Sequence, residues 1–558
     1  MAVTGAMPRA GPVGHTYPVS DVNAIAESVL GFTLRPVQQE TAAASAAGRD
    51  TLAVLPTGSG KSAIYQVAGL ARGGLTVVVS PLVALQRDQL RSLTGRHVAA
   101  RMLNSGLRHA ERAEALAAVG DGSAGFVLLG PEQLANEETL AAIAGSSRPV
   151  TLIAIDEAHL ISQWGHDFRP DYLRLADVAE ALGRPPLLAL TATAAPPVQA
   201  DITRRLRMTD PKVIVAGFDR PNLSLSVRLT RPDRPEAEAI EDRTVEVMLA
   251  HETPALVYAL THAHCEELAE RLRRDSYKVA AYHAGVPAAE RSRVQDAFFA
   301  GELEIVVATS AFGMGIDKPD IRTVVHAGVP GSLDEYYQEV GRAGRDGRPG
   351  AAVLVHDSRA MRIPRLLAAR ARVPADTVTA VVDQLETAHG RVALADVARA
   401  AGVSHAAAQR VAAELIDQHF LTPSGHDEVT VGVPVPASAR DAVLASGDRR
   451  QTILASQIDT ARHYAETTRC RRAELLAYFG EHYAAPCGNC DNDDAAPTPG
   501  PAWSPATGDG TRVTHKYWGS GLLLARDDHE LSVLFDSVGY RHLTPAVLTN
   551  GLLTIDQG

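Results

Sequence analysis

The sequence of 558 residues is poor in cysteine and in long apolar runs. Four cysteines cannot form a disulfide scaffold in a chain of this length, and sparse cysteine suits a reducing cytoplasm. No run of about 18 apolar residues is present, so we expect no membrane span. Residues 1–20 contain three prolines, one arginine and no apolar stretch, so we expect a flexible leader and not a signal peptide. These absences predict a cytoplasmic protein.

The sequence also lacks an excess of positive charge. Lysine and arginine number 54, and aspartate and glutamate number 65, which makes the net charge −11. Because phosphate binding depends on basic surface, this balance argues against a general nucleic-acid binder. Residues 449–472 have the opposite charge balance, with six arginines and two acids. They either face duplex phosphates or form a solvated helix face. The 46% hydrophobic and 21% charged residues are typical of a globular chain, and its length suggests about three to five domains.

Apolar runs that alternate with helical patterns occupy residues 50–330. This alternation is typical of βαβ units with buried parallel strands. The runs fall into two sets, separated by residues 220–241, which contain three prolines and many charges and which we interpret as a hinge. We therefore predict two α/β domains with parallel sheets. Nine strands are expected, at residues 51–55, 76–80, 126–130, 151–156, 187–191, 255–260, 279–283, 304–310 and 323–328.

A glycine-rich loop stands between the first expected strand and a helix, in the sequence TLAVLPTGSGKS. Glycines let backbone N–H groups turn inward around phosphates, Lys61 would reach the β- and γ-phosphates, and the Ser62 hydroxyl would bind Mg²⁺. Leu55 stands where the strict pattern has glycine, and the alternative is a surface turn with an incidental lysine. We expect the nucleotide phosphates to be held by Thr57, Gly58, Ser59, Gly60, Lys61 and Ser62.

Two further elements would complete a site for phosphoryl transfer. Asp156 ends an apolar run and would hold Mg²⁺, and Glu157 beside it would polarise the attacking water. Arg342 and Arg345 lie three residues apart in VGRAGRDG, after the second set of strands. They could reach a nucleotide only across a cleft, which is how an arginine finger couples hydrolysis to domain closure. The alternatives are an acidic helix N-terminus and a solvated basic helix end.

These motifs, taken in order through most of residues 32–357, resemble those of the RecQ family of DNA helicases in superfamily 2. The similar segments are LRPVQQ, PTGSGKS, SPLVALQRDQ, GPEQL, IDEAH, TATA, YHAGV, ATSAFGMGIDKPDIR and EYYQEVGRAGRDG. The resemblance implies that Gln38 binds the adenine edge and that Arg35 and Phe32 pack against the base. It also implies that Asp317 lies in the cleft between the domains and that Gln338 acts beside the two arginines.

The segment SQWGHDFRPDY at residues 162–172 resembles the aromatic-rich loop that distinguishes RecQ proteins from other helicases of the superfamily. Trp164 and Phe168 would stack on single-strand bases without reading sequence, and Arg169 would hold the DNA backbone. Because the loop begins three residues after His159, that histidine would couple DNA binding to hydrolysis. The alternative is that both aromatic residues form the edge of a core.

Three of the four cysteines fall in one cluster. Cys470, Cys487 and Cys490 resemble the zinc-binding domain of the RecQ family, in which a fourth cysteine stands where this sequence has Asp493. Zn²⁺ accepts carboxylate oxygen, so we predict a site of three thiolates and one carboxylate, with a weakened or lost site as the alternative. The remaining cysteine, Cys265, lies in a helical pattern and is expected to be an inert buried thiol.

The order of the C-terminal parts departs from the RecQ pattern. Residues 394–422 resemble a helix-turn-helix, with Gly402 at the turn and Arg410 on a second helix at 404–419. We interpret them as a relocated winged helix that contacts duplex DNA or packs structurally. The tail from residue 511 resembles the small Tudor-like barrel at the end of UvrD/PcrA-type helicases. Its aromatic residues form either an exposed face for a protein partner or the barrel core: Tyr517, Trp518 and Tyr540.

The predicted fold is α/β, with two tandem RecA-like domains followed by helical and β units. The expected division is a leader at 1–20, RecA-like domains at 21–220 and 221–372, a winged-helix-like domain at 373–447, a zinc-binding domain at 448–494, a linker at 495–510 and a Tudor- or SH3-like barrel at 511–558. The resemblance implies an ATP-dependent 3′–5′ DNA helicase that acts on single-stranded and forked DNA in repair or recombination, with ATP, Mg²⁺ and Zn²⁺ as cofactors, in a bacterial-type cytosol or nucleoid. The alternatives are a DNA-stimulated translocase or strand-annealing factor that unwinds poorly, and a non-enzymatic DNA-binding regulator.

Overall fold

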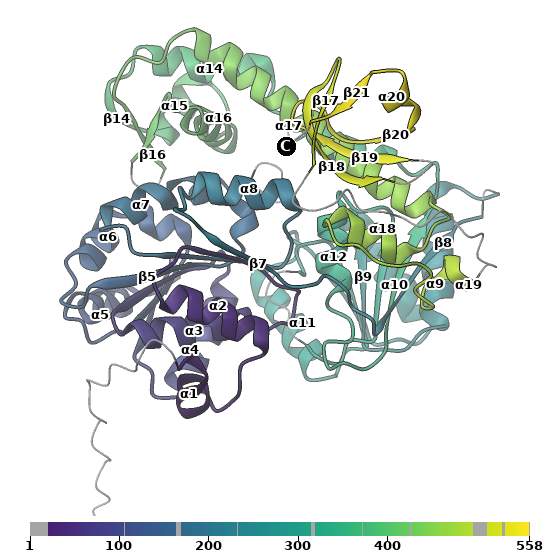
Figure 1. Ribbon diagram of the computed structural model, residues 1–558, viewed down its shortest axis with the longest axis horizontal. Coiled ribbons are helices and arrows are strands. Elements are labelled where there is room, and N and C mark those ends of the chain that lie inside the picture. Colours follow the sequence, from purple (N-terminus) through teal and green to yellow (C-terminus); the bar gives the residue numbers. More distant parts are fainter. Residues whose placement is uncertain are drawn as a thin grey trace, which may run out of the picture.

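The computed structural model describes residues 21–104, 106–162, 169–231, 233–313, 318–370, 372–424, 427–494, 511–526 and 530–556. Two α/β units lie side by side, with a helical lobe above the first unit and a small β-sheet above the second (Figure 1). Among the residues described, no helix is long and apolar enough to cross a bilayer.

The first α/β unit is built on a seven-stranded parallel sheet. Its strands are β1 (Thr51–Val54), β2 (Leu75–Val79), β3 (Ala100–Leu103), β4 (Phe126–Leu129), β5 (Val150–Ile155), β6 (Leu187–Thr191) and β7 (Lys212–Val215), in the order β3-β4-β2-β5-β6-β1-β7. The helices are α1 (Val22–Ile25), η1 (Ala26–Leu30), α2 (Pro36–Ala46), α3 (Lys61–Arg72), α4 (Val83–Thr94), α5 (His109–Gly120), η2 (Pro131–Ala135), α6 (Glu137–Ala144), η3 (Ala158–Ile161), η4 (Pro170–Arg174), α7 (Leu175–Ala181) and α8 (Pro196–Arg205). The central strands are buried throughout because helices cover both faces of the sheet.

The second α/β unit has a six-stranded parallel sheet. Its strands are β8 (Leu223–Leu229), β9 (Ala255–Ala259), β10 (Val279–Tyr282), β11 (Ile305–Ala308), β12 (Thr323–Ala327) and β13 (Gly350–His356), in the order β10-β11-β9-β12-β13-β8. The helices are α9 (Glu236–Leu249), α10 (His262–Arg274), α11 (Ala288–Phe299) and α12 (Leu333–Val340). The two predicted RecA-like sheets are therefore confirmed, and the carboxyl ends of their strands position the site described below.

The interpretation of residues 220–241 as an irregular hinge is wrong. Strand β8 and the start of helix α9 occupy most of this interval. In β8, Leu223, Leu225 and Val227 are buried and alternate with less buried residues, as in an edge strand with one face on the core. The prolines misled the interpretation because Pro221 precedes the strand and Pro235 precedes the helix, where a missing N–H is tolerated.

The helical lobe has the element order of a winged helix. It contains α14 (Ala375–Glu386), β14 (Gly390–Ala393), α15 (Leu394–Ala401), α16 (His405–Asp417), β15 (Thr422–Pro423) and β16 (Glu428–Val431), with a three-stranded antiparallel sheet in the order β14-β16-β15. Gly402 ends α15 with φ 66°, a backbone conformation that favours glycine. The helix pair at residues 394–419 thus stands where the sequence predicted it.

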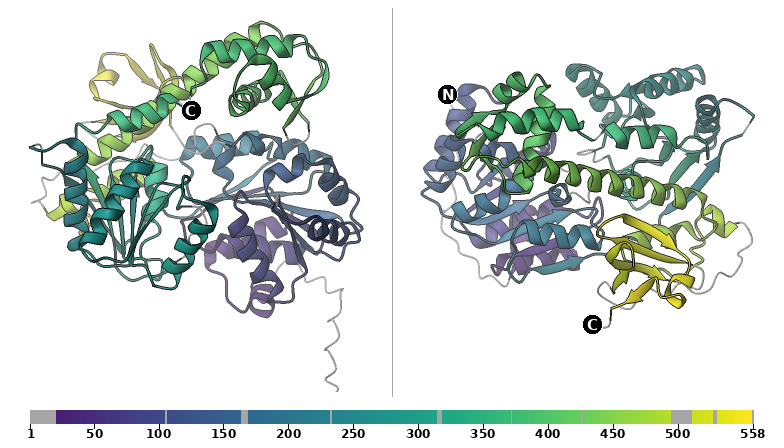
Figure 2. Two further views of the ribbon diagram at one scale, coloured as in Figure 1. Left: turned by 180° about the vertical axis from the view of Figure 1, so that it is seen from behind. Right: turned by 90° about the horizontal axis from the view of Figure 1, so that it is seen from above.

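Two helices connect this lobe to the second unit, α13 (Arg362–Arg370) before it and α17 (Ser438–Glu466) after it. Helix α17 has 29 residues and is therefore about 43 Å long. It leads from the lobe to the C-terminal sheet and can be followed in both views of Figure 2. The limit expected between residues 447 and 448 falls in the middle of this helix.

The remaining elements are α18 (Arg471–Tyr478), α19 (Asp491–Asp494), β17 (Arg512–His515), β18 (Gly519–Arg526), β19 (Leu531–Phe535), β20 (Gly539–Leu543), α20 (Ala546–Thr549) and β21 (Leu553–Ile555). The five strands form an antiparallel sheet in the order β20-β19-β18-β17-β21. The sheet has a core of its own, made by Val513, Leu523, Leu531, Val533, Phe535 and Leu553. Strand β20 also packs on α17, so the sheet is attached to the rest of the molecule.

Candidate functional site

The glycine-rich loop lies between β1 and α3, as the sequence predicted. Gly58 and Gly60 have φ of 78° and 75°, which permits the tight inward turn. A Cβ placed on Gly60 would lie 2.6 Å from Nε2 of Gln38, so the packing of that side chain also requires glycine here. The side-chain hydroxyls of Thr57 and Ser59 are buried without hydrogen-bond partners among the residues described. Such orphaned polar groups indicate a site whose ligand supplies the missing contacts.

Gln38 ties helix α2 to this loop. Its Nε2 donates to the carbonyl oxygens of Ser59 at 2.7 Å and Gly60 at 3.2 Å, and its Oε1 accepts from the N–H of Arg35 at 2.8 Å. Sequence reasoning placed Gln38 at the adenine and missed its contact with the phosphate loop. Phe32 and Arg35 are exposed beside it, and contact of all three residues with a base stays a prediction.

The acidic pair lies at the carboxyl end of β5. Asp156 is 8% exposed, and its burial, reinforced by the neighbouring Glu157, raises its pKa to about 7, while Lys61 acts in the opposite direction. Glu157 has φ 51°, and its Oε2 is buried without a hydrogen bond to any described residue. Two desolvated carboxylates in sequence repel each other, so a cation bound here would relieve the repulsion. The carboxylate oxygens of this pair fit Mg²⁺, and the Ser62 hydroxyl as a second protein ligand stays a prediction.

His159 connects the acidic pair to the end of strand β6. Its Nδ1 lies 3.4 Å from Oε2 of Glu157 and 2.8 Å from Oγ1 of Thr191, the first residue of the TATA segment. The Thr191 hydroxyl in turn contacts the backbone of Thr193. The sequence predicted a coupling role for His159 from its place before the aromatic-rich loop, but it did not identify Thr191 as the partner.

The loop after α12 reaches the phosphate loop across the interface between the two units. A Cβ placed on Gly58 would lie 3.5 Å from Cγ and Cδ of Arg345, and one on Gly341 would lie 3.4 Å from Thr57. Arg342 is buried in the second unit, where one of its Nη atoms would lie 3.2 Å from a Cβ on Gly313. Arg345 therefore lies next to the phosphate loop of the first unit. Gln338, on α12, is buried as well, and its role stays a prediction.

Two residues that the sequence did not single out hold this arginine loop in place. Arg220 donates to the carbonyl oxygens of Gly341, Ala343 and Gly344 at 3.0–3.2 Å, and Asn222 donates to Gly344 at 2.8 Å. Burial lowers the pKa of Arg220, because desolvation disfavours the charged guanidinium. In the sequence, Arg220 and Asn222 are distinguished only by their position between the two sets of expected strands.

The aromatic-rich loop is described only at its two ends. Trp164 and Phe168 lie outside the described residues, as does Asp317. Arg169 is described and its N–H donates to the carbonyl oxygen of Leu160 at 2.8 Å, which closes the loop on η3. The DNA-binding roles of Trp164, Phe168 and Arg169 stay predictions.

The four predicted zinc ligands converge. The ligand atoms of Cys470, Cys487, Cys490 and Asp493 all lie within 4.8 Å of one another. Oδ2 of Asp493 lies 2.9 Å from Sγ of Cys487 and also accepts from the backbone N–H groups of Cys487 and Gly488 at 2.9 Å. These bonds orient the carboxylate toward the thiols, so the residues fit Zn²⁺ with three sulfur ligands and one oxygen ligand. Cys265 is buried in α10, away from this cluster.

The cysteine cluster is docked on the edge of the second sheet. The N–H of Leu225 in β8 donates to the carbonyl oxygen of Asn489 at 3.2 Å, and the N–H of Val227 donates to Oδ2 of Asp491 at 2.8 Å. Arg472, on α18, pairs with Asp219 and donates to the carbonyl oxygen of Leu223 at 2.6 Å. The cluster therefore covers the N–H groups that an edge strand would otherwise expose.

Known families match the chain over these same elements. The descriptions that match are "DEAD/DEAH box helicase" over residues 35–202, "Helicase conserved C-terminal domain" over 239–347 and "RecQ zinc-binding" over 438–494. The "Probable ATP-dependent DNA helicase RecS" of Bacillus subtilis is 36% identical over 365 residues, which cover 65% of this chain and 72% of that protein. The chain belongs to the RecQ family.

Further comparisons agree with this assignment. The "ATP-dependent DNA helicase RecQ" of Haemophilus influenzae is 33% identical over 471 residues, which are 84% of this chain and 62% of that protein, so the chain spans about three fifths of that relative's length. A structure of Mycobacterium smegmatis helicase Lhr bound to ssDNA and AMP-PNP aligns with a TM-score of 0.50 at 22% identity, over 78% of this chain and 63% of that one, and shows likeness of fold alone. The helicase domains imply ATP and Mg²⁺ as cofactors, and the zinc-binding domain implies Zn²⁺.

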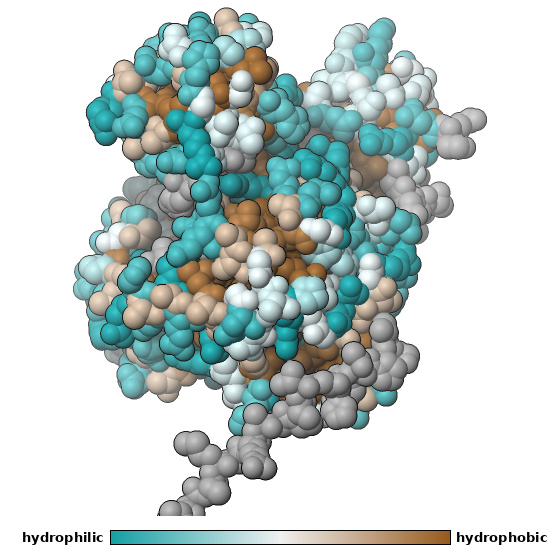
Figure 3. Space-filling view, turned by 90° about the vertical axis from the view of Figure 1, so that its left-hand side faces the viewer, coloured by the Kyte–Doolittle hydropathy of each residue, from teal (hydrophilic) through white to brown (hydrophobic). Residues whose placement is uncertain are grey.

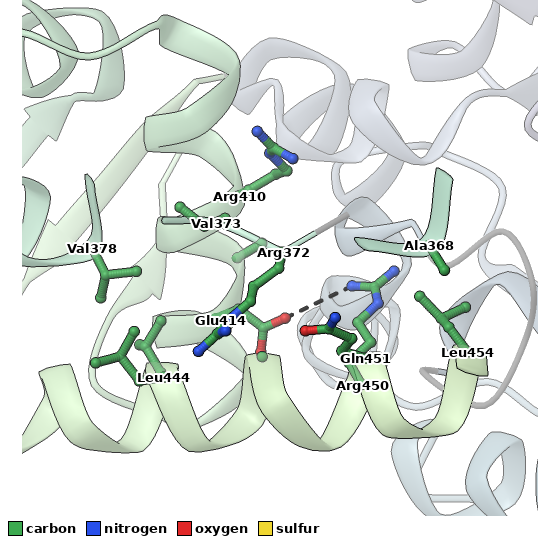
Figure 4. Close-up of a pocket in the computed structure, with 13 residues that line it drawn as sticks. Ala368, Arg372, Val373, Val378, Arg410, Glu414, Leu444, Arg450, Gln451 and Leu454 are labelled. Atoms are coloured by element: carbon green, nitrogen blue, oxygen red, sulfur yellow. Dashed lines mark ion pairs between the residues drawn. The ribbon is translucent and has the colours of Figure 1, made fainter. Parts of the chain in front are cut away.

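In the winged helix of this RecQ-family chain, two polar residues near the start of α16, His405 and Gln409, are bound to a carboxylate. Asp427 accepts from the His405 ring at 2.6 Å and from Gln409 at 2.9 Å. Arg410 lines a pocket of about 260 Å³ between α16 and α17, together with Arg450, which pairs with Glu414 across it (Figure 4). DNA binding by Arg410 stays a prediction, but a helix whose first turn holds a carboxylate is poorly suited to reading bases.

The arginine-rich stretch 449–472 does not form an uncompensated basic face. Five of its six arginines pair with acids: Arg450 with Glu414, Arg462 with Glu466, Arg469 with Glu474, Arg471 with Asp491 and Arg472 with Asp219. Arg471 and Arg472 are also buried. The stretch therefore holds the zinc-binding domain together more than it offers charge to phosphates.

The three aromatic residues of the C-terminal sheet have different surroundings. Tyr540 is 7% exposed and stacks on Tyr478 of α18 with ring centroids 5.0 Å apart, so it belongs to the docking core. Trp518 is half-buried against the sheet and stacks on His515 at 4.1 Å. Only Tyr517 of the three is largely exposed, at 72%. A shared exposed face is therefore wrong for Tyr540.

Proposed function

We propose that this chain is an ATP- and Mg²⁺-dependent DNA helicase of RecQ type. It would couple ATP hydrolysis to 3′–5′ movement along single-stranded DNA and to the separation of forked duplexes in repair or recombination. The observation that carries the proposal is the close approach of the Arg345 side chain to Gly58, because it brings an arginine of one unit to the phosphate loop of the other. The relatives named as ATP-dependent DNA helicases support the choice of DNA.

Each polar residue of the cleft has a definite task in this proposal. Lys61 would neutralise the transferring phosphate, and Ser62 and Asp156 would hold Mg²⁺, which supplies further charge neutralisation when bound. Glu157 would orient and polarise the attacking water, and His159 would report the state of that carboxylate to Thr191 and to the loop that follows η3. Arg345 would stabilise the transition-state charge only when the two units are closed.

ATP hydrolysis with and without oligo-dT is the first experiment. We expect single-stranded DNA to stimulate hydrolysis by the native chain, and Lys61→Ala or Glu157→Gln to reduce the stimulated rate about 100-fold or more. If either variant hydrolyses ATP at nearly the native rate, the assignment of the site is refuted. Forked duplexes with a 3′ or a 5′ tail test polarity, and unwinding of the 5′-tailed fork alone would overturn the 3′–5′ proposal.

A translocase or strand-annealing factor with weak unwinding is a second candidate. It is favoured by the carboxylate of Asp427, which precedes β16 and binds His405 at the start of α16, and by the paired arginines of α17 and α18, since both reduce the charge available to a duplex. An ATPase assay run beside an unwinding assay separates the two candidates. Strong DNA-stimulated hydrolysis with little strand separation would favour the translocase.

We also infer a cytoplasmic location and a protein partner for the C-terminal sheet. The exposed Tyr517, with the Lys516 ammonium 5.7 Å from its ring centre, supports a small docking patch. A Tyr517→Ala variant should retain unwinding in vitro and lose only the partner, and a loss of unwinding would contradict this assignment.

For the domain limits, we propose the division predicted from the sequence, with the zinc-binding domain beginning at Ser438, where α17 starts.

A further inference from the structure

Both described ends of the aromatic-rich loop are fixed to the body of the first unit. Ser162, the first residue of the loop, is fully buried, and its Oγ donates to Oδ2 of Asp201 at 2.8 Å. At the other end, Arg169 is bound through its backbone to Leu160. Asp201 lies on α8 and is only 4% exposed. The carboxylate of Asp201 therefore sets the point at which the chain leaves η3 to form the loop.

The same carboxylate binds an arginine that reaches the winged-helix lobe. Nε of Arg205 lies 3.1 Å and 3.0 Å from the two carboxylate oxygens of Asp201, and Nη1 of Arg205 pairs with Asp417 at the end of α16. The side chains of Arg205 and Asp417 are both largely buried. Shielded charges of this kind are costly to separate, since the separation breaks an ion pair that is largely removed from water. A continuous polar chain thus joins α16 to the start of the loop.

The lobe is attached to both α/β units. Helices α13 and α17 join it covalently to the second unit, and the Asp417–Arg205 pair and an Arg391–Glu137 pair join it to the first. In the space-filling view the lobe stands above the first unit, and hydrophilic residues lie where the two meet (Figure 3). A lobe held at both units must move relative to one of them whenever the cleft between the units opens or closes.

We propose that the winged-helix lobe positions the aromatic-rich loop through Asp417, Arg205 and Asp201, so that movement of the lobe changes how the loop holds single-stranded DNA. Asp201 is the positioning residue, because its Oδ2 serves both Ser162 and Arg205. Oδ2 of Asp201 is shared between Ser162 and Arg205, and its Oδ1 also pairs with Arg204. Loss of the Asp417 pair would therefore shift Arg205 against a carboxylate that also holds Ser162. The inference rests on the proposed helicase function and adds a coupling between the winged-helix lobe and the aromatic-rich loop.

The experiment compares three variants of the full, zinc-loaded chain: Asp417→Asn, Asp417→Glu and Asp396→Asn. Asp396 is a matched control, because its carboxylate pairs with Arg399 at 2.8 Å within the same lobe. The readouts are the affinity for fluorescein-labelled oligo-dT without nucleotide, the ATPase rate without DNA, and the oligo-dT concentration that half-saturates the stimulation. The oligo-dT affinity needs no catalysis, so it tests the link separately from the proposed activity.

We expect Asp417→Asn to weaken oligo-dT binding and to raise the half-saturating concentration about fivefold or more, with the rate without DNA unchanged. Asp417→Glu, which keeps a carboxylate, should recover most of the native affinity, and Asp396→Asn should behave as native. Asp201→Asn should act in the same direction as Asp417→Asn. The proposal is overturned if Asp417→Asn binds oligo-dT as tightly as Asp396→Asn does. It is also overturned if the ATPase rates of Asp417→Asn with and without DNA fall by the same factor while its oligo-dT affinity is that of the native chain. A native chain that binds oligo-dT but hydrolyses no ATP would refute the helicase function and leave this comparison valid.

Discussion

Replacing Asp156 with asparagine should stabilise the nucleotide-free protein while it abolishes ATP hydrolysis. Burial and the neighbouring Glu157 raise the pKa of Asp156 to about 7, against about 3.9 in an unfolded chain. Each pKa unit corresponds to about 1.4 kcal/mol, so the ionised carboxylate lowers the free energy of unfolding by about 4 kcal/mol at pH 8. Asparagine has nearly the same shape and carries no charge, so the variant avoids this penalty.

The effect has a definite dependence on pH. Because the folded-state pKa is above the unfolded value, the folded protein binds the proton more tightly, and its stability falls as the pH rises from about 4 to about 7. The asparagine variant lacks this titration. Its advantage should therefore be full at pH 8 and should shrink steadily as the pH is lowered toward 5.

Thermal unfolding at pH 8 and pH 5.5 tests the prediction. We expect the transition of the first α/β unit to rise by about 10 °C in Asp156→Asn at pH 8, and by clearly less at pH 5.5. Asp88→Asn is the control, because Asp88 lies on α4 in the same unit with its side chain 64% exposed. The reasoning is refuted if Asp156→Asn unfolds at the same temperature as Asp88→Asn at pH 8, or if its gain is equal at both pH values.

Three further results follow from the contacts. Arg220→Met should lower the maximal ATPase rate on the order of tenfold to a hundredfold with little change in the half-saturating ATP concentration, because the arginine loop loses its support, and a native rate would contradict this. Cys487→Ser should reduce bound zinc, measured by atomic absorption, to well below one equivalent. Asp493→Cys should bind zinc more tightly than the native chain in a competition with a chelator. Equal zinc affinity of the two proteins would argue that Asp493 is already an optimal ligand. Tyr540→Ala should lower the free energy of unfolding by about 3 kcal/mol in urea titrations, since it empties a buried site against Tyr478, and a change below that of an exposed tyrosine would disprove the docking.

The parts of the site that could be predicted are contiguous in sequence. The loop at residues 56–62, the Asp156–Glu157 pair and the close spacing of Cys487, Cys490 and Asp493 each bring their functional groups together within a few residues. The local backbone then decides the geometry, as the left-handed glycines of the phosphate loop show. The two parallel sheets were predictable for a similar reason, since buried strands read as continuous apolar runs.

Strand β8 was not predicted, because it is not a continuous apolar run. It lies at a sheet edge with one face covered, so it alternates polar and apolar residues and carries charge, and its neighbouring prolines made it look irregular. The same applies to Arg220, whose role depends on carbonyl oxygens more than a hundred residues away. An arginine between two domains has many uses, and nothing within its own segment distinguishes them.

The sequence by itself determined the RecQ-like order of the motifs, and it predicted the residues of the cleft and the four zinc ligands, whose ligand atoms the structure brings together. Only the tertiary structure decided which residues of different segments share a site: Gln38 with the phosphate loop, Arg345 with Gly58, and Asp417 with Arg205. The physical reason is that a short motif is held by its own backbone, whereas a contact between distant segments depends on how whole units pack. Ordinary charged residues acquire their partners from that packing, and their residue type alone does not reveal it.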